Sequence, residues 1–150
     1  LFSEEGDMAR QHIEVLQSFP FSVDKLYGFL AVHENLSVIF PAKIKRVKDG
    51  QNGVNGVGST RRMTLAPGVI LEETVTKAET NEVIEYTISK GGWPVKNHYG
   101  VMRFYSAENG CRLHYTIDFD SALPGTGWVV KKALEAPIRA GLKKLAARGL

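Results

Sequence analysis

The stretch GVGSTRRMTLAPGVILEETVT, residues 56–76, predicts two β-strands joined by a tight turn. Its apolar residues recur at every second position, which is the period of a strand. The Pro67-Gly68 pair between the two runs is typical of a turn. A connection this short joins antiparallel neighbours, so the stretch predicts a β-hairpin around which the rest of the chain can be arranged.

Alternation assigns the side chains of the first strand to two faces of the sheet. Met63 and Leu65 are apolar, and Arg61 shares their buried face. Arg62 lies on the opposite face with Thr60, and both are expected to meet solvent. The two adjacent arginines therefore have different surroundings.

The second strand of the hairpin brings a carboxylate to the same buried face. Leu71 and Val75 set that face, and Glu73 lies between them. With the turn centred on Pro67, Arg61 lies directly across from Glu73. Buried charges need partners. The pair is either a satisfied ion pair in a packed core or a polar layer in an internal cavity, where a ligand or water completes the hydrogen bonding.

Other chemistries fit the sequence poorly. The glycines before the hairpin, Gly53, Gly56 and Gly58, lack the G-x-G-x-x-G spacing, and a strand rather than a helix follows them. No G-x-S-x-G motif is present. The histidines are His12, His33, His98 and His114. Their spacing is not that of metal ligands, so we expect no metal and no cofactor.

Strand-like runs continue on both sides of the hairpin, separated by turn signals such as DGQNG, GGWP and ENG. Short connections favour an antiparallel meander. The seven predicted strands cover about 11–19, 43–49, 57–66, 69–78, 82–90, 98–107 and 111–120.

Three helices are predicted outside these runs. Two short ones follow the first strand, beginning after Ser22 and at Glu34. A long helix covers 126–148, where we expect a kink or break at Pro137. Its apolar face is Val130, Leu134, Ile138, Leu142 and Leu145. Its basic residues, largely off that face, are Lys131, Lys132, Arg139, Lys143 and Lys144.

These elements predict an α+β fold in which a seven-stranded curved antiparallel sheet wraps around the C-terminal helix. We expect a flexible N-terminal tail at 1–10 and a single domain at 11–150. The net charge of +3 is too small to indicate a nucleic-acid partner. The single Cys111 excludes an intramolecular disulfide, and no apolar run is long enough to span a membrane. We therefore expect a cytoplasmic protein.

Alternation in the later strands adds further side chains to the buried face. The candidate ligand-binding residues are Arg61, Met63, Leu71, Glu73, Ile84, Tyr86, Ile88, His98, Met102, Phe104, Tyr115 and Ile117.

The order of elements, with GVGSTRRMT, ILEETVT, WPVKNHYGVMRF and NGCRLHYTIDFD, resembles one protein family over about residues 11–148. It is the polyketide cyclase/dehydrase-like branch of the START and birch-pollen-allergen-like helix-grip superfamily, also called SRPBCC. The features that carry the resemblance are Gly56, Gly58 and Arg61, then Glu73, then Pro94 and Val95, and finally Tyr115. The chain departs from the family at Phe40-Pro41, where tryptophan commonly precedes the proline.

The resemblance implies a deep cavity between the sheet and the C-terminal helix. Members of the family bind lipids, sterols, polyketides, quinones or plant metabolites there, and some cyclise or dehydrate a bound polyketide. The first expectation is therefore binding of a hydrophobic small molecule, in a monomer or homodimer. The basic C-terminal helix is a further candidate for peripheral contact with a membrane.

The alternative is a polyketide cyclase or dehydratase. Such chemistry needs a proton acceptor, a donor and a group that holds an enolate oxygen. His98 or Glu73 would be the base, Arg61 the oxyanion partner, and Tyr86 or Tyr115 the donor. The same groups could instead orient the polar end of a ligand without turnover.

Overall fold

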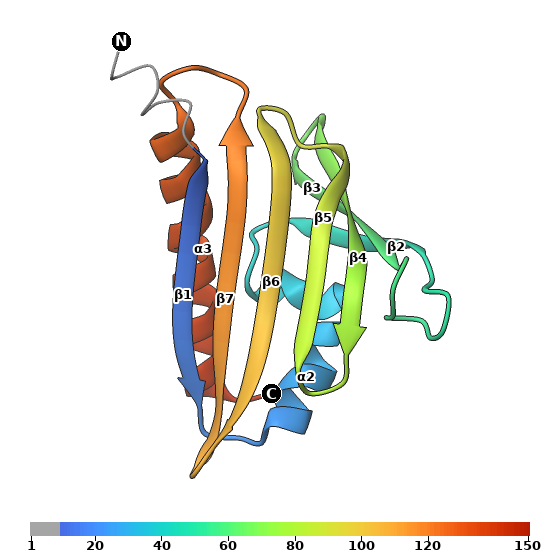
Figure 1. Cartoon of the computed structure of the whole chain (residues 1–150), viewed down its shortest axis with the longest axis vertical. Helices are drawn as coiled ribbons and strands as arrows, with labels where there is room; N and C mark the ends of the chain where they lie inside the picture. The colour runs from blue at the N-terminus through green and yellow to red at the C-terminus, as the bar shows by residue number, and fades with distance from the viewer. Residues whose placement is uncertain (1–9) are drawn as a thin grey trace.

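The computed structural model describes residues 10–150 (Figure 1), so the tail expected at 1–10 lies outside the described residues except for Arg10. A seven-stranded antiparallel sheet has the order β1-β7-β6-β5-β4-β3-β2. The strands are β1 (Gln11–Phe19), β2 (Lys43–Lys48), β3 (Thr60–Ala66), β4 (Val69–Glu79), β5 (Val83–Gly91), β6 (Val95–Ala107) and β7 (Gly110–Ser121). The helices are α2 (Val23–Ala31), the short 3-10 helix η1 (His33–Val38) and α3 (Gly127–Arg148).

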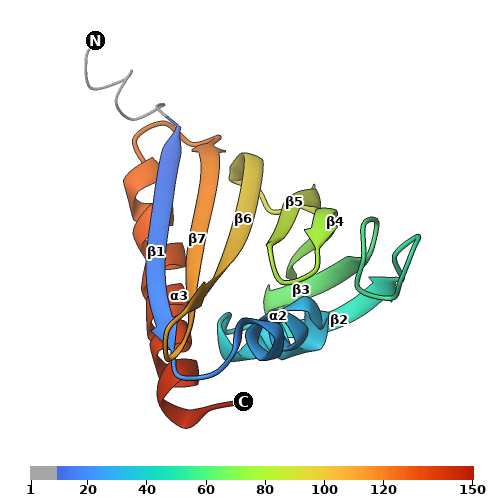
Figure 2. The same cartoon turned by 60° about the horizontal axis from the view of Figure 1, so that its bottom comes forward.

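The sheet curves around the C-terminal helix, as the sequence predicts. Helix α3 packs against β1, β7 and η1, while α2 packs against β6 and β7. Figure 2 shows β2 and β3 running across the direction of β1 and β7, so the sheet is strongly twisted. Within residues 10–150, none of the helices has the length and apolar character that crossing a bilayer requires.

The central hairpin has the predicted register. Arg61 pairs with Glu73 and Met63 with Leu71 across β3 and β4. The first strand of this hairpin, β3, begins at Thr60 rather than at the predicted residue 57, because Gly58 has a positive φ of 90°. Pairing nevertheless continues there, since the Val75 amide donates to the Ser59 carbonyl at 2.9 Å.

Two polar residues that alternation assigns to the outer face, Thr60 and Glu85, are buried. The exposed fraction of Thr60 is 6% because its hydroxyl contacts the Thr74 hydroxyl at 2.9 Å on the neighbouring strand. Glu85 is 9% exposed, and its carboxylate accepts a hydrogen bond from the Tyr99 hydroxyl. Alternation gives the face of a side chain correctly, but neighbours on the same face decide its exposure.

Helix α3 runs unbroken through Pro137, so the expected break does not occur. Proline removes the hydrogen bond to the carbonyl four residues earlier, here that of Ala133. Ala133 is exposed, and water can satisfy its carbonyl.

The two halves of α3 have different surroundings. Ile138, Leu142 and Leu145 in the second half are fully buried in the core, and burying such a side chain contributes about 1.5–3 kcal/mol. Gly141 lets η1 pack closely, since an added Cβ would lie 2.7 Å from the Ile39 Cα. Val130 in the first half is only partly buried. The core therefore fills one end of the sheet and leaves space at the other.

Candidate functional site

A cavity of about 600 Å³ lies between β3–β7 and the first half of α3. Apolar side chains make up most of its wall, and the charged or ionisable groups in it are Glu73, Tyr86 and His98. The predicted ligand-binding residues that line it are Met63, Leu71, Glu73, Tyr86, Ile88, His98 and Ile117.

Five residues predicted to line the cavity do not: Arg61, Ile84, Met102, Phe104 and Tyr115. All five are buried on the predicted face, but in the packed core. Phe104 contacts the ring of Tyr27 from α2 edge-on, with the ring centroids 5.1 Å apart. Alternation cannot tell where along a strand a neighbouring helix fills the space.

Several lining residues were not predicted from the sequence. Val69, Ile70, Trp93 and Val129 lie at the ends of elements or in a connection, and none was named as a lining residue from the sequence. Val130 and Leu134 were predicted only as part of the apolar face of α3, and both line the cavity.

Arg61 lies directly behind the cavity wall and is 3% exposed. Its Nε donates to Glu73 Oε1 at 2.9 Å, and its Nη2 lies 2.8 Å from the same oxygen. The guanidinium carbon also lies 4.7 Å from the centroid of the Tyr86 ring. Arg61 therefore neutralises and orients the Glu73 carboxylate and supports the Tyr86 ring.

His33 also forms a hydrogen bond with Arg61, and no sequence pattern pointed to His33. Arg61 Nη1 donates to His33 Nδ1 at 3.2 Å, and His33 Nε2 lies 2.8 Å from Ser59 Oγ. Because guanidinium nitrogens only donate, Nδ1 must accept and Nε2 must carry the proton. Ser59 in turn donates to the Gly56 carbonyl at 2.6 Å.

The electrostatics of His33 agree with this assignment. Burial, together with the positive charges of Arg61 and Arg46, lowers the pKa of His33 to about 3. The imidazole is therefore neutral at physiological pH, as an acceptor for Arg61 must be. The segment Gly56–Ser59, which the sequence already excluded as a phosphate loop, anchors this hydrogen-bond chain.

His98 is the polar group of the cavity whose hydrogen bonding is incomplete. Its Nε2 lies 4.0 Å from Glu73 Oε2, too far for a hydrogen bond. Its buried Nδ1 has no partner among residues 10–150. Burial lowers the pKa of His98, Glu73 opposes that shift and Arg61 adds to it. The ring is therefore neutral at pH 7.

Tyr86 lies between the cavity and the core. Its hydroxyl bonds that of Tyr115, and its ring centroid is 5.4 Å from that of His98. Burial, and then the neighbouring Tyr115 and Glu73, raise the pKa of Tyr86, so both hydroxyls stay protonated. Gly100 leaves room for this ring, because an added Cβ would overlap it.

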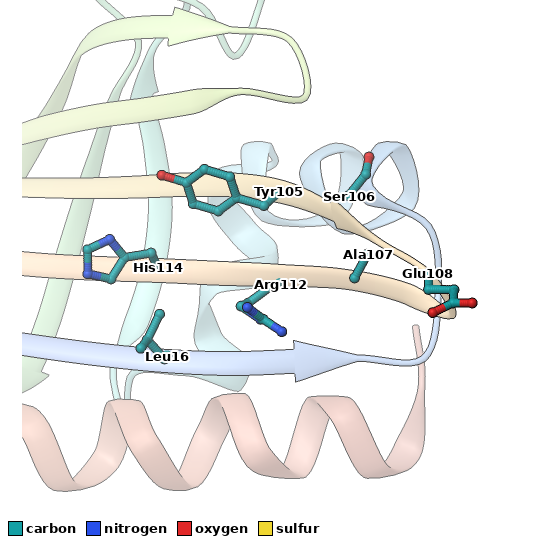
Figure 3. A pocket seen from close by; sticks show the side chains of 7 residues that line it. All are labelled: Leu16, Tyr105, Ser106, Ala107, Glu108, Arg112 and His114. Carbon is teal, nitrogen blue, oxygen red and sulfur yellow. The ribbon is translucent and has the colours of Figure 1, made fainter.

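A second hollow lies on the outer face of the sheet, where β1, β6 and β7 carry Leu16, Tyr105 and His114 (Figure 3). Its His114 is already paired with Glu14 at 2.8 Å. Leu16 and Tyr105 are exposed there. This hollow lacks the buried, unpartnered polar group of the inner cavity, so the inner cavity is the candidate site.

The comparison with known sequence families agrees with this architecture. The family described as "Polyketide cyclase / dehydrase and lipid transport" matches residues 10–149. The chain belongs to this family. The resemblance inferred from the sequence is therefore confirmed, and the match covers the whole sheet and α3. A comparison with curated protein sequences finds no match.

Solved structures share the family's fold at low identity. The di-domain ARO/CYC StfQ from the steffimycin biosynthetic pathway is similar, with a TM-score of 0.73 and 17% identity over 97% of this chain and 51% of StfQ. Norcoclaurine synthase from Thalictrum flavum is similar with a TM-score of 0.69 and 15% identity, over 97% of this chain and 91% of the synthase. Ara h 8.0201 is similar with a TM-score of 0.69 and 16% identity, over 94% of this chain and 100% of Ara h 8.0201. At these identities the likeness is one of fold.

Proposed function

We propose that this protein binds a hydrophobic small molecule that carries a neutral hydrogen-bonding group. The apolar wall and the volume of about 600 Å³ support this, since ligand pockets typically occupy about 300–1,000 Å³. Lipids, polyketides and quinone-like molecules fit the description, and family membership favours them.

The observation that carries the proposal is the unpartnered Nδ1 of His98. A buried polar atom without a partner costs about 1–3 kcal/mol. The Glu73 carboxylate favours a proton on the Nε2 that lies nearest to it, which leaves Nδ1 as an acceptor. A hydroxyl group of the ligand would satisfy it.

The charge around His98 favours a neutral ligand over a carboxylate. Arg61 is already held by Glu73 and His33, and it does not line the cavity. With His98 neutral, the cavity presents the Glu73 carboxylate and no free cation among its lining residues. A fatty-acid carboxylate would therefore find no free cation to pair with in the cavity.

The second candidate is a cyclase or dehydratase, and the free Nδ1 of neutral His98 favours it too. This nitrogen could remove a proton from a CH₂ group between two carbonyls of a bound poly-β-ketone. The resulting carbanion would attack a second carbonyl of the same chain, and the new alkoxide would take up a proton. Loss of water would then complete a dehydration.

In this chemistry His98 and Tyr86 keep roles expected from the sequence, whereas Arg61 and Tyr115 act indirectly. Tyr86, which lines the cavity, is the candidate proton donor. Arg61 acts through Glu73 and is a positioning residue, because it does not reach the cavity. Tyr115 acts through its hydrogen bond to Tyr86.

Calorimetric titration with a hydroxylated anthraquinone and with palmitate tests the binding proposal. His98→Leu should weaken anthraquinone binding about tenfold, the equivalent of one buried hydrogen bond. His114→Leu, on the outer face, is the matched control and should bind like the parent. Equal affinities of the parent and His98→Leu, or tighter binding of palmitate, would contradict the proposal. Turnover of a poly-β-ketone that His98→Leu abolishes would establish the enzyme alternative.

A further inference from the structure

Exposed apolar side chains gather around the mouth of the cavity. Five side chains that line it are also exposed to solvent: Leu65, Val69, Ile70, Trp93 and Val129. Trp128 precedes Val129 in the first turn of α3 and is 58% exposed, and Trp93 is 69% exposed. We call these six residues the rim.

The rim residues lie in or directly beside three connections at the same end of the molecule. They are the β3–β4 turn, the β5–β6 loop and the passage from β7 into α3, all at the upper end in Figure 1. This arrangement follows from the antiparallel sheet, because every second connection lies at the same end of the strands. The six side chains therefore surround one opening, and an apolar surface leads from solvent into the cavity.

The charge around the rim has one sign. Segments 65–71, 90–97 and 121–134 contain Lys90, Lys96, Lys131 and Lys132 and no aspartate or glutamate. Lys90, Lys96 and Lys132 are exposed.

The acidic residues that flank these segments are each paired with an arginine. Glu72 pairs with Arg62, Asp120 with Arg10, and Glu135 with Arg139. The rim is therefore an apolar patch in a positive surrounding field.

We propose that the rim docks onto the surface of an anionic lipid bilayer. Tryptophan side chains favour the interface between lipid and water, and lysines beside them are attracted to anionic head groups. A second copy of this chain fits less well, because a symmetric dimer would bring four lysines against four. Docking would open the cavity directly onto the bilayer. It goes beyond ligand binding and does not depend on the ligand's identity.

The membrane contact expected from the sequence involves the basic face of the whole of α3, whereas the rim lies at one end of that helix. Lys131 and Lys132 belong to the end of α3 beside the rim, whereas Lys143 and Lys144 belong to the opposite end (Figure 1). The two lysine pairs thus form a matched comparison, with the same charge change on the same helix.

Trp93 and Trp128 are the two tryptophans of the chain, so tryptophan fluorescence reports directly on the rim. Adding vesicles of phosphatidylcholine that contain about 30% of the anionic lipid phosphatidylglycerol should shift tryptophan emission to the blue. Vesicles with brominated acyl chains should quench it. Pure phosphatidylcholine vesicles should bind at least about tenfold more weakly, because the lysines lose their partners.

Variants then locate the contact. Lys131→Gln with Lys132→Gln should weaken cosedimentation with anionic vesicles about tenfold, whereas Lys143→Gln with Lys144→Gln should change it less than about twofold. Trp93→Ser should also weaken cosedimentation. Circular dichroism checks that each variant is folded, and anthraquinone titration without vesicles tests the cavity separately.

Three results would overturn the proposal. One is an unchanged emission spectrum with anionic vesicles. Another is equal loss of cosedimentation in the two lysine pairs. The third is a concentration-dependent blue shift without vesicles, together with a doubled mass in light scattering, which would assign the rim to a second copy.

Discussion

Replacing Arg61 with leucine would leave the Glu73 carboxylate buried without its cation. Arg61 and Glu73 are 3% and 5% exposed, so water cannot take over the role of the guanidinium. Breaking a buried pair in this way costs about 3–5 kcal/mol. His33 Nδ1 also loses its donor, which adds about 1 kcal/mol or more.

Removing the carboxylate as well should reverse most of this loss. Arg61→Leu with Glu73→Leu places two apolar side chains across from each other on β3 and β4. Replacing both members of a buried pair can be nearly neutral. The remaining deficit is then the loss at His33, about 1 kcal/mol or more.

The neighbouring pair on the outer face provides the control. Arg62 pairs with Glu72 at 2.9 Å on the same two strands, but its side chain is 44% exposed. An exposed pair contributes about 0–1 kcal/mol, so Arg62→Leu should have little effect.

Urea unfolding followed by circular dichroism measures all three variants. We expect the free energy of unfolding to fall by about 4–6 kcal/mol in Arg61→Leu, as the sum of the two losses above. The double variant should recover more than half of that. Equal stabilities of Arg61→Leu and Arg62→Leu, or a double variant no better than Arg61→Leu, would refute the buried-pair reasoning.

Three further predictions concern stability and the cavity. The folded-state pKa of His33, about 3, lies below its ordinary value near 6.5. The unfolded chain therefore binds more protons, and stability should fall by up to about 1.4 kcal/mol per unit as pH drops from about 6.5 towards 3; a flat urea midpoint between pH 7 and 5 would contradict this. Gly100→Ala should destabilise the protein by about 1–3 kcal/mol, because the added Cβ overlaps the Tyr86 ring. Gly28→Ala in α2, with nothing within 4 Å of the added Cβ, should instead stabilise it by about 0.5–1 kcal/mol. Thermal melts should separate the two variants. Leu134→Trp should fill the cavity and abolish anthraquinone binding while leaving the melting temperature within a few degrees, and undiminished binding would exclude this cavity as the site.

The fold was predictable because its information is local. The alternation in residues 57–76 and the Pro67-Gly68 turn fix both the faces and the register of the hairpin, and β3 and β4 follow them. Arg61 and Glu73 could be paired from the sequence for the same reason.

The division between cavity and core was not predictable, because it depends on where the helices lie along the sheet. Phe104 and His98 share one strand and one face, yet α2 covers Phe104 and leaves His98 beside the cavity. His33 lies in a 3-10 helix, where a single buried polar residue gives no periodic signal. Most rim residues lie at the ends of strands and of α3, and alternation assigns no face to Trp93, which lies between β5 and β6.

The most direct test of ligand binding at His98 is nitrogen-15 NMR of the histidine rings in protein labelled at histidine. Each ring can be assigned by substitution. On addition of the hydroxylated anthraquinone, the Nδ1 resonance of His98 should shift as it gains a hydrogen bond, while those of His33 and His114 stay in place. An unchanged His98 resonance with the ligand fully bound would contradict the account.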